Sequence, residues 1–114
     1  METLNYKGYL GSLHYSKADK TFWGKVEMIR SLVTFEADNA SELEGAFQEA
    51  VDDYLETCKM QGAAPERPFK GIFNIRINPE MHKAAYEEAL KEGVSLNKFV
   101  ESSIANALAS HARV

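Results

Sequence analysis

The segment from Lys70 to Asn78, K-G-I-F-N-I-R-I-N, constrains the fold of this chain more than any other feature. Apolar and polar residues alternate in it, which is the two-residue period of a strand with one covered face. The apolar face holds Phe73, Ile75 and Ile77, and the polar face holds Asn74 and Arg76. A lone strand cannot satisfy its edges or cover its apolar face. We therefore expect the strand to pair with its twin in a second copy.

Two helices are predicted directly after this strand. Asn78 and Pro79 are typical of a helix start, and Gly93 is typical of a helix end. Ser95 then caps a second helix, in which apolar residues recur at helical spacing from Leu96 to Leu108. A unit made of one strand and two helices has no core of its own. We expect an even-numbered homo-oligomer, either a dimer or a tetramer.

The order of strand, helix and helix resembles the ribbon-helix-helix family of DNA-binding proteins, which includes the Arc and MetJ repressors. The resemblance is carried by F-N-I-R-I-N-P at 73–79 and by G-V-S-L-N at 93–97. It implies two sets of DNA-binding residues, namely Ile72, Asn74 and Arg76 on the groove-facing strand, and Ser95, Leu96 and Asn97 at a phosphate-binding helix start. Arg suits guanine and Asn suits adenine, each through two parallel hydrogen bonds. Ile72 departs from the polar pattern, and either touches a thymine methyl group or only packs.

The residues before this unit predict a separate α+β domain, with a three-stranded antiparallel sheet and one packed helix. Strands are expected at 6–15, 22–28 and 32–36, where β-branched and aromatic residues gather between turn signals. Trp23 is expected among the aromatic core residues or on a surface that faces a protein partner. The helix should begin after Asn39, with Glu42 in the capping-box position, and should end at Gly62. The single cysteine, Cys58, lies on its apolar side and is expected to be a buried thiol.

A stretch of glycine and proline separates the two parts of the chain. It predicts a linker at 62–69, between a domain at 1–61 and a domain at 70–114. Charge divides in a similar way, because residues 1–66 hold six Lys and Arg against twelve Asp and Glu, a balance of −6. Residues 67–114 hold seven against five, a balance of +2. This asymmetry indicates two modules with different partners.

The N-terminal part resembles the antitoxins of the HicB family. The similar stretches are K-G-Y-L-G-S-L-H-Y at 7–15, F-W-G-K-V at 22–26, L-V-T-F-E-A-D at 32–38 and F-Q-E-A-V-D-D-Y-L at 47–55. The resemblance extends over residues 5–108. It implies a partial RNase H-like domain that binds a HicA-type mRNA-cleaving toxin, followed by a ribbon-helix-helix that binds the operator DNA of its own promoter and represses that operon.

Two other functions stay open at this point. The chain could be a stand-alone transcriptional regulator of the same build, whose N-terminal domain binds another protein or a small ligand. It could also be a metal-dependent nuclease, but Asp52 and Asp53 are adjacent on a helix and point about 100° apart, which is poor for joint metal ligation. We therefore expect no catalytic residues, no enzyme activity and no cofactor.

Three further absences are expected. The histidines His14, His82 and His111 lack ligand spacing, so we expect no metal site. No apolar run approaches the roughly 18 residues of a membrane span, and the first residues do not resemble a signal peptide. A single cysteine fits a reducing compartment, so a cytoplasmic location is expected.

Overall fold

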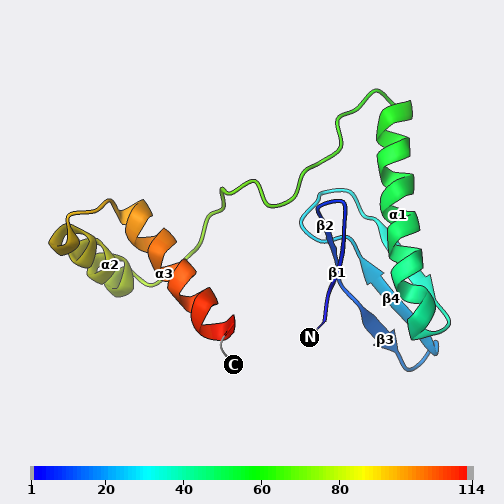
Figure 1. Ribbon diagram of the computed structural model, residues 1–114, viewed down its shortest axis with the longest axis horizontal. Helices are drawn as coiled ribbons and strands as arrows, with labels where there is room; N and C mark the ends of the chain where they lie inside the picture. The colour runs from blue at the N-terminus through cyan, green and yellow to red at the C-terminus, as the bar shows by residue number, and fades with distance from the viewer. Residues whose placement is uncertain (1, 113–114) are drawn as a thin grey trace. The chain divides into compact units, whose positions relative to one another are not determined.

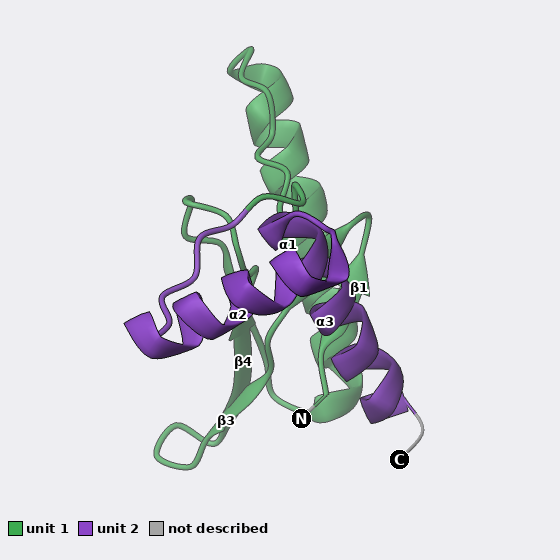
Figure 2. Ribbon diagram, turned by 90° about the vertical axis from the view of Figure 1, so that its left-hand side faces the viewer, with its two compact units in different colours: residues 1–72 green, residues 73–114 purple. Residues whose placement is uncertain are grey.

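The computed structural model describes residues 2–112, which divide into one compact unit up to Ile72 and a second from Phe73 onward (Figure 2). The first unit contains five strands and a helix: β1 (Leu4–Tyr6), β2 (Tyr9–Gly11), β3 (His14–Ser16), β4 (Thr21–Lys25), β5 (Thr34–Ala37) and α1 (Ala40–Met60). The second unit contains α2 (Pro79–Glu92) and α3 (Leu96–Ala112).

Strands β3, β4 and β5 form a three-stranded antiparallel sheet in that order. The register places Tyr15 opposite Phe22 and Gly24 opposite Phe35. Helix α1 runs along one face of this sheet and packs mainly against β4 and β5 (Figure 1). The predicted α+β fold with a three-stranded antiparallel sheet and a packed helix is confirmed for this unit.

The single strand expected at 6–15 is wrong, because the chain forms three short strands there. Lys7 and Gly8 both have left-handed backbone conformations, with φ of 51° and 83°. They turn β1 back onto β2 in an antiparallel hairpin of its own. After β2, the Ser12 N–H donates to the Lys25 carbonyl oxygen at 3.0 Å, which joins the hairpin to the end of β4.

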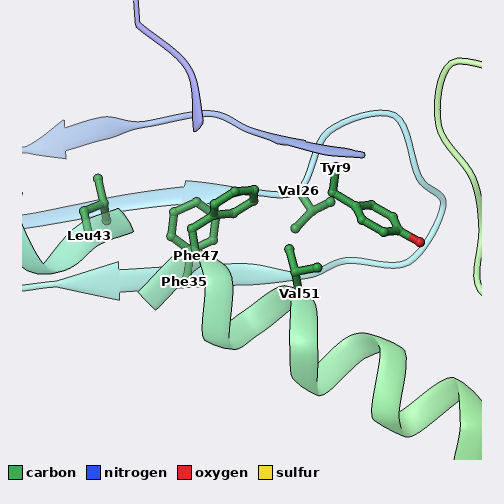
Figure 3. Close-up of a cluster of buried hydrophobic side chains, with 6 residues drawn as sticks. All are labelled: Tyr9, Val26, Phe35, Leu43, Phe47 and Val51. Carbon is green, nitrogen blue, oxygen red and sulfur yellow. The ribbon is translucent and has the colours of Figure 1, made fainter. Parts of the chain in front are cut away.

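The core lies between the sheet and α1. Figure 3 shows the rings of Phe35 and Phe47 against each other, flanked by the four other buried side chains of the cluster, Tyr9, Val26, Leu43 and Val51. The ring centroids of Phe35 and Phe47 are 5.2 Å apart. Trp23 was expected in this core, but it is 39% exposed, because it points to the opposite face of β4, where its ring stacks on His14.

The helix boundaries follow the capping residues that the sequence indicated. The Asn39 and Asn78 side chains accept hydrogen bonds from the N–H groups of Glu42 and Met81, at 3.0 and 2.7 Å. Gly62 and Gly93 take left-handed conformations just after α1 and α2, as expected of helix-ending glycines. These helix starts and ends are confirmed, and so is the burial of the Cys58 thiol.

The second unit is poorly covered by its own residues. Helices α2 and α3 pack on each other, but Ala89 is the only buried residue among those described from Phe73 onward. The segment at 70–78, expected to be a strand, is not part of any sheet in this single chain. A strand takes its hydrogen bonds from a neighbour, and the described residues supply none to this segment.

Candidate nucleic-acid and protein interfaces

The segment before α2 exposes both its apolar and its polar side chains. Phe73, Ile75 and Ile77 are 66%, 57% and 43% exposed. Asn74 and Arg76, between them, are exposed as well, and neither forms a hydrogen bond or ion pair among residues 2–112. Ile72, at the end of the first unit, is 89% exposed. The three sequence-predicted strand residues are therefore available for contacts outside the chain.

The start of α3 has the geometry of an anion site at a helix N-terminus. The Ser95 hydroxyl oxygen accepts a hydrogen bond from the Lys98 N–H, and its carbonyl oxygen accepts one from the Phe99 N–H, both at 3.0 Å. The N–H groups of Leu96 and Asn97, in the first turn, have no intrahelical acceptor. Together with the helix dipole, free N–H groups favour a negatively charged ligand. In this chain no hydrogen bond among the described residues links this helix start to Asn74 or Arg76.

An acidic groove runs between β5 and the first half of α1. Its volume is about 670 Å³. Its lining contributes four carboxylates, from Glu36, Asp38, Glu42 and Glu49. The sequence indicated an acidic face on the helix alone. It did not indicate that Glu36 and Asp38 line the same groove, because that depends on how β5 packs beside α1.

Asp52 and Asp53 have different surroundings. The Asp52 carboxylate accepts hydrogen bonds from the Lys7 ammonium at 2.8 Å and from the Tyr6 hydroxyl at 3.1 Å. The hydrogen bond from Lys7 lowers the pKa of Asp52, and the same bond raises the pKa of Lys7. Asp53 instead lines a second groove, of about 610 Å³, beside the C-terminal half of α1. The two carboxylates are thus not brought together.

Helix α1 does not cover the outer face of the sheet. Trp23 and His14 lie there as a cross-strand pair with ring centroids 4.4 Å apart. Glu36 and Lys25 are on the same face of the sheet and are exposed. An aromatic pair bordered by charges is a surface that protein partners commonly use.

The described residues form neither a metal-binding cluster nor a membrane-spanning helix. Among residues 2–112, no group of three or more His, Cys, Asp and Glu side chains is placed to hold a metal ion. Within the same range, no helix combines the length and the apolar character needed to cross a membrane.

Comparison with known proteins gives one family. Residues 54–104 match the model of the HicB family, which covers the end of α1, the segment between the units, α2 and the first half of α3. Over these residues, which are less than half of the chain, the protein is similar to the HicB family. No curated protein and no solved structure matches the chain.

Proposed function

We propose that this chain is a HicB-type antitoxin with two binding activities and no catalysis. Its N-terminal unit, a partial RNase H-like fold, neutralises a HicA-type mRNA-cleaving toxin by covering it. Its C-terminal unit pairs with a second copy as a ribbon-helix-helix and represses its own operon by binding operator DNA. The observation that carries the proposal is the amphipathic segment at 72–78 joined to two capped helices, inside the stretch that matches the HicB family.

The exposed apolar surface of the C-terminal unit supports pairing with a second copy. Besides Phe73, Ile75 and Ile77, the helices expose five large apolar side chains, Met81, Tyr86, Leu90, Ile104 and Leu108. A soluble protein rarely leaves such a group uncovered, since burying each one is worth about 1.5–3 kcal/mol. Pairing two copies through the segment at 72–78 would satisfy the strand hydrogen bonds and cover these side chains together.

DNA reading would then fall to the other face of the paired strands. Two antiparallel strands form a ribbon that fits the major groove. Asn74 and Arg76 would contact bases, and Ile72 would contact a thymine methyl group or pack beside it. Ser95, Leu96 and Asn97 would hold a backbone phosphate at the start of α3, which fixes the position of the ribbon without reading sequence.

Charge supports the acidic groove of the N-terminal unit as the toxin-facing surface. A protein that cleaves mRNA needs basic surface to bind the phosphate backbone. Glu36, Asp38, Glu42 and Glu49 present the opposite charge in one groove. Complementary charge speeds association and selects the partner. The stacked pair of Trp23 and His14, on the outer sheet face, is a second contact candidate.

The DNA activity is tested by fluorescence anisotropy with the DNA upstream of this gene, at two salt concentrations. We expect wild-type protein to bind it more tightly than scrambled DNA, and Asn74→Ala/Arg76→Ala to lose that preference. Lys91→Ala, which removes a positive charge at the end of α2, should keep the preference. Equal binding of both DNAs by wild type and the double variant would contradict the repressor function.

The toxin activity is tested by calorimetry with the product of a short toxin gene beside this one. We expect Glu42→Lys/Glu49→Lys to weaken binding at low salt. Glu44→Lys, on the same helix but outside the groove lining, should change it much less. If the toxin binds all three proteins alike, the acidic groove is not the docking surface. If no toxin gene exists, the stand-alone regulator is favoured.

The absence of catalysis is part of the proposal. Clustered acids hold metal ions in RNase H-like nucleases, whereas Asp52 is engaged with Lys7 and Tyr6. We expect no magnesium- or manganese-dependent RNA cleavage by purified protein. Cleavage that disappears in Asp52→Asn or Asp53→Asn would overturn this part.

A further inference from the structure

The segment expected to be a free linker is partly bound to the N-terminal unit. Its hydrogen bonds to the loop between β4 and β5, to Tyr9 and to Tyr54 are all made by Glu66. Its carboxylate accepts hydrogen bonds from the Arg30 N–H at 2.7 Å, from the Ser31 N–H at 3.1 Å and from the Ser31 hydroxyl at 3.0 Å. These donors lie in the loop between β4 and β5, 35 residues or more away in sequence. One residue therefore joins the end of the unit to its sheet.

The backbone of Glu66 is held as well, from the core side. Its carbonyl oxygen accepts a hydrogen bond from the Tyr9 hydroxyl at 2.7 Å, and its N–H donates to the Tyr54 hydroxyl at 2.9 Å. Figure 3 shows the Tyr9 hydroxyl at the outer end of the buried cluster, pointing away from it. The rings of Tyr9 and Tyr54 meet edge to face, with centroids 6.0 Å apart. The buried ring of Tyr9 and the partly buried ring of Tyr54 thus support the two backbone contacts.

The end of α1 directs the chain toward these partners. Gly62, in a left-handed conformation, and Ala63 donate to the carbonyl oxygens of Lys59 and Cys58, at 3.2 and 2.9 Å. This pair of bonds is the Schellman motif, which reverses the chain at a helix end. The chain consequently leaves the axis of α1, and Ala63, Ala64 and Glu66 line the groove beside Tyr54.

The loop that receives the carboxylate is shaped for an anion. Met28 has a left-handed conformation, with φ of 61°, and the consecutive N–H groups of Arg30 and Ser31 then point at one ligand. Successive N–H groups in such a turn make an anion-binding nest. The hydrogen bonds from Arg30 and Ser31 lower the pKa of Glu66. The other titratable and charged groups around this contact are Arg30, Tyr9, Tyr54, Cys58 and Arg67.

We propose that Glu66 is a clasp that fixes residues 64–66 to the N-terminal unit, so that the free tether between the units begins at Arg67. Without the clasp, the tether would begin at Ala64, after the two residues that the end of α1 holds. The clasp removes three residues, 64–66, from the tether, or about 10 Å of extended chain. It thereby limits how far the two units can separate, whatever each of them binds.

The clasp has a consequence for the proposed function. A tether that begins at Arg67 keeps each N-terminal unit close to the ribbon that its own chain would supply. The range of distances allowed between neighbouring N-terminal units on DNA would therefore be small. Opening the clasp would increase that range without changing any DNA-contacting residue.

The test is backbone ¹⁵N relaxation of the full chain, without DNA or partner, on wild type and Glu66→Ala. Pro65 has no amide, so the reporters are Ala63, Ala64 and Glu66 or its replacement. In wild type we expect order parameters near those of α1, about 0.85, and a fall below about 0.6 only beyond Arg67. In Glu66→Ala the fall should move back to Ala64, because the hydrogen bonds at the end of α1 still hold Gly62 and Ala63. Glu56→Ala, an exposed change on α1, should match wild type.

Two results would overturn the clasp. One is that Ala64 and Glu66 are already as mobile as the tether in wild type. The other is that Ala64 and the replaced residue 66 remain rigid in Glu66→Ala, with the amides of α1 and β4 confirming an intact fold. Since neither DNA nor toxin is present, these results are independent of the proposed function.

A second measurement is made on wild type, with Glu66→Gln as its control. The amide proton shifts of Arg30 and Ser31 should follow the protonation of the Glu66 carboxyl group, with a midpoint below that of an ordinary glutamate. Their failure to titrate together with the Glu66 side chain would also overturn the clasp. In Glu66→Gln this titration should be absent.

Discussion

The two units of this chain differ in how much of their apolar surface they bury. The N-terminal unit covers a cluster of six buried side chains between one sheet and one helix. The C-terminal unit buries only Ala89 among its described residues and exposes most of its large apolar side chains. Both have well-capped helices, so local sequence signals are equally good in the two. The difference shows that capping and periodicity make helices, but that a folded unit also needs a closed core.

The largest expected effect concerns the core of the N-terminal unit. Phe47 is fully buried, so Phe47→Ala should destabilise this unit by about 3–5 kcal/mol through lost burial and a cavity. Urea denaturation followed by circular dichroism measures it, and the loss should not depend on protein concentration. Phe69→Ala, at a 59% exposed position, should change stability by less than about 0.5 kcal/mol. Similar losses for both would mean that this core is not closed.

The next effect concerns the C-terminal unit and should depend on concentration. Ile75→Ala removes a side chain expected to become buried on pairing, at about 2 kcal/mol per copy. Two copies lose about 4 kcal/mol together, so the dimer dissociation constant should rise by roughly a thousandfold in sedimentation equilibrium. Ile72→Ala, the same change on the opposite face of the segment, should leave association nearly unchanged. Equal effects would contradict the assigned faces.

A smaller effect on stability is expected at two glycines of the N-terminal unit, with opposite signs at the two positions. A methyl group at Gly24 would overlap the Ser12 carbonyl oxygen and crowd the Phe35 ring, so Gly24→Ala should destabilise by about 1–3 kcal/mol. At Gly45, on α1, a methyl group meets nothing within 4 Å. Gly45→Ala should stabilise by about 0.5–1 kcal/mol, because alanine favours helix. Thermal melts of the two variants measure the opposite signs.

The smallest effect is the pH dependence of the pair formed by Lys7 and Asp52. Because the pKa of Asp52 is lowered in the folded chain, its contribution is present above the ordinary aspartate pKa and is lost as pH falls through the lowered value. Both side chains are about half exposed, so the effect should be small. Urea midpoints of wild type and Asp52→Asn should therefore differ at neutral pH and converge in acid. Asp53→Asn, outside the pair, should show no such convergence.

The sequence predicted most where a signal is local. Asn39, Asn78, Gly62 and Gly93 marked helix ends correctly, since a cap depends on residues within one turn. The hairpin of β1 and β2 was missed, although Gly8 offered a signal for a turn. Trp23 was misplaced because its size suggested the core, whereas the alternation of β4 put it on the outer face.

Contacts between distant residues could not be predicted in this way. Nothing near Glu66 in the sequence indicates the N–H groups of Arg30 and Ser31, which come from the loop between β4 and β5. The carboxylates of Glu36 and Glu49 share a groove only because β5 lies beside α1. Such sites depend on strand register and on the packing of distant elements, which a single sequence does not reveal. The residues proposed to bind DNA stay a prediction.

The most direct test of the contrast between the units is amide hydrogen exchange, measured at high and at low protein concentration. We expect amides of β4 and β5 to be protected at both concentrations. Alternate amides from Phe73 to Ile77 should be protected only at high concentration, where the strands of two copies pair. Unprotected amides throughout Phe73–Ile77 at the highest concentration would contradict a ribbon built from two chains.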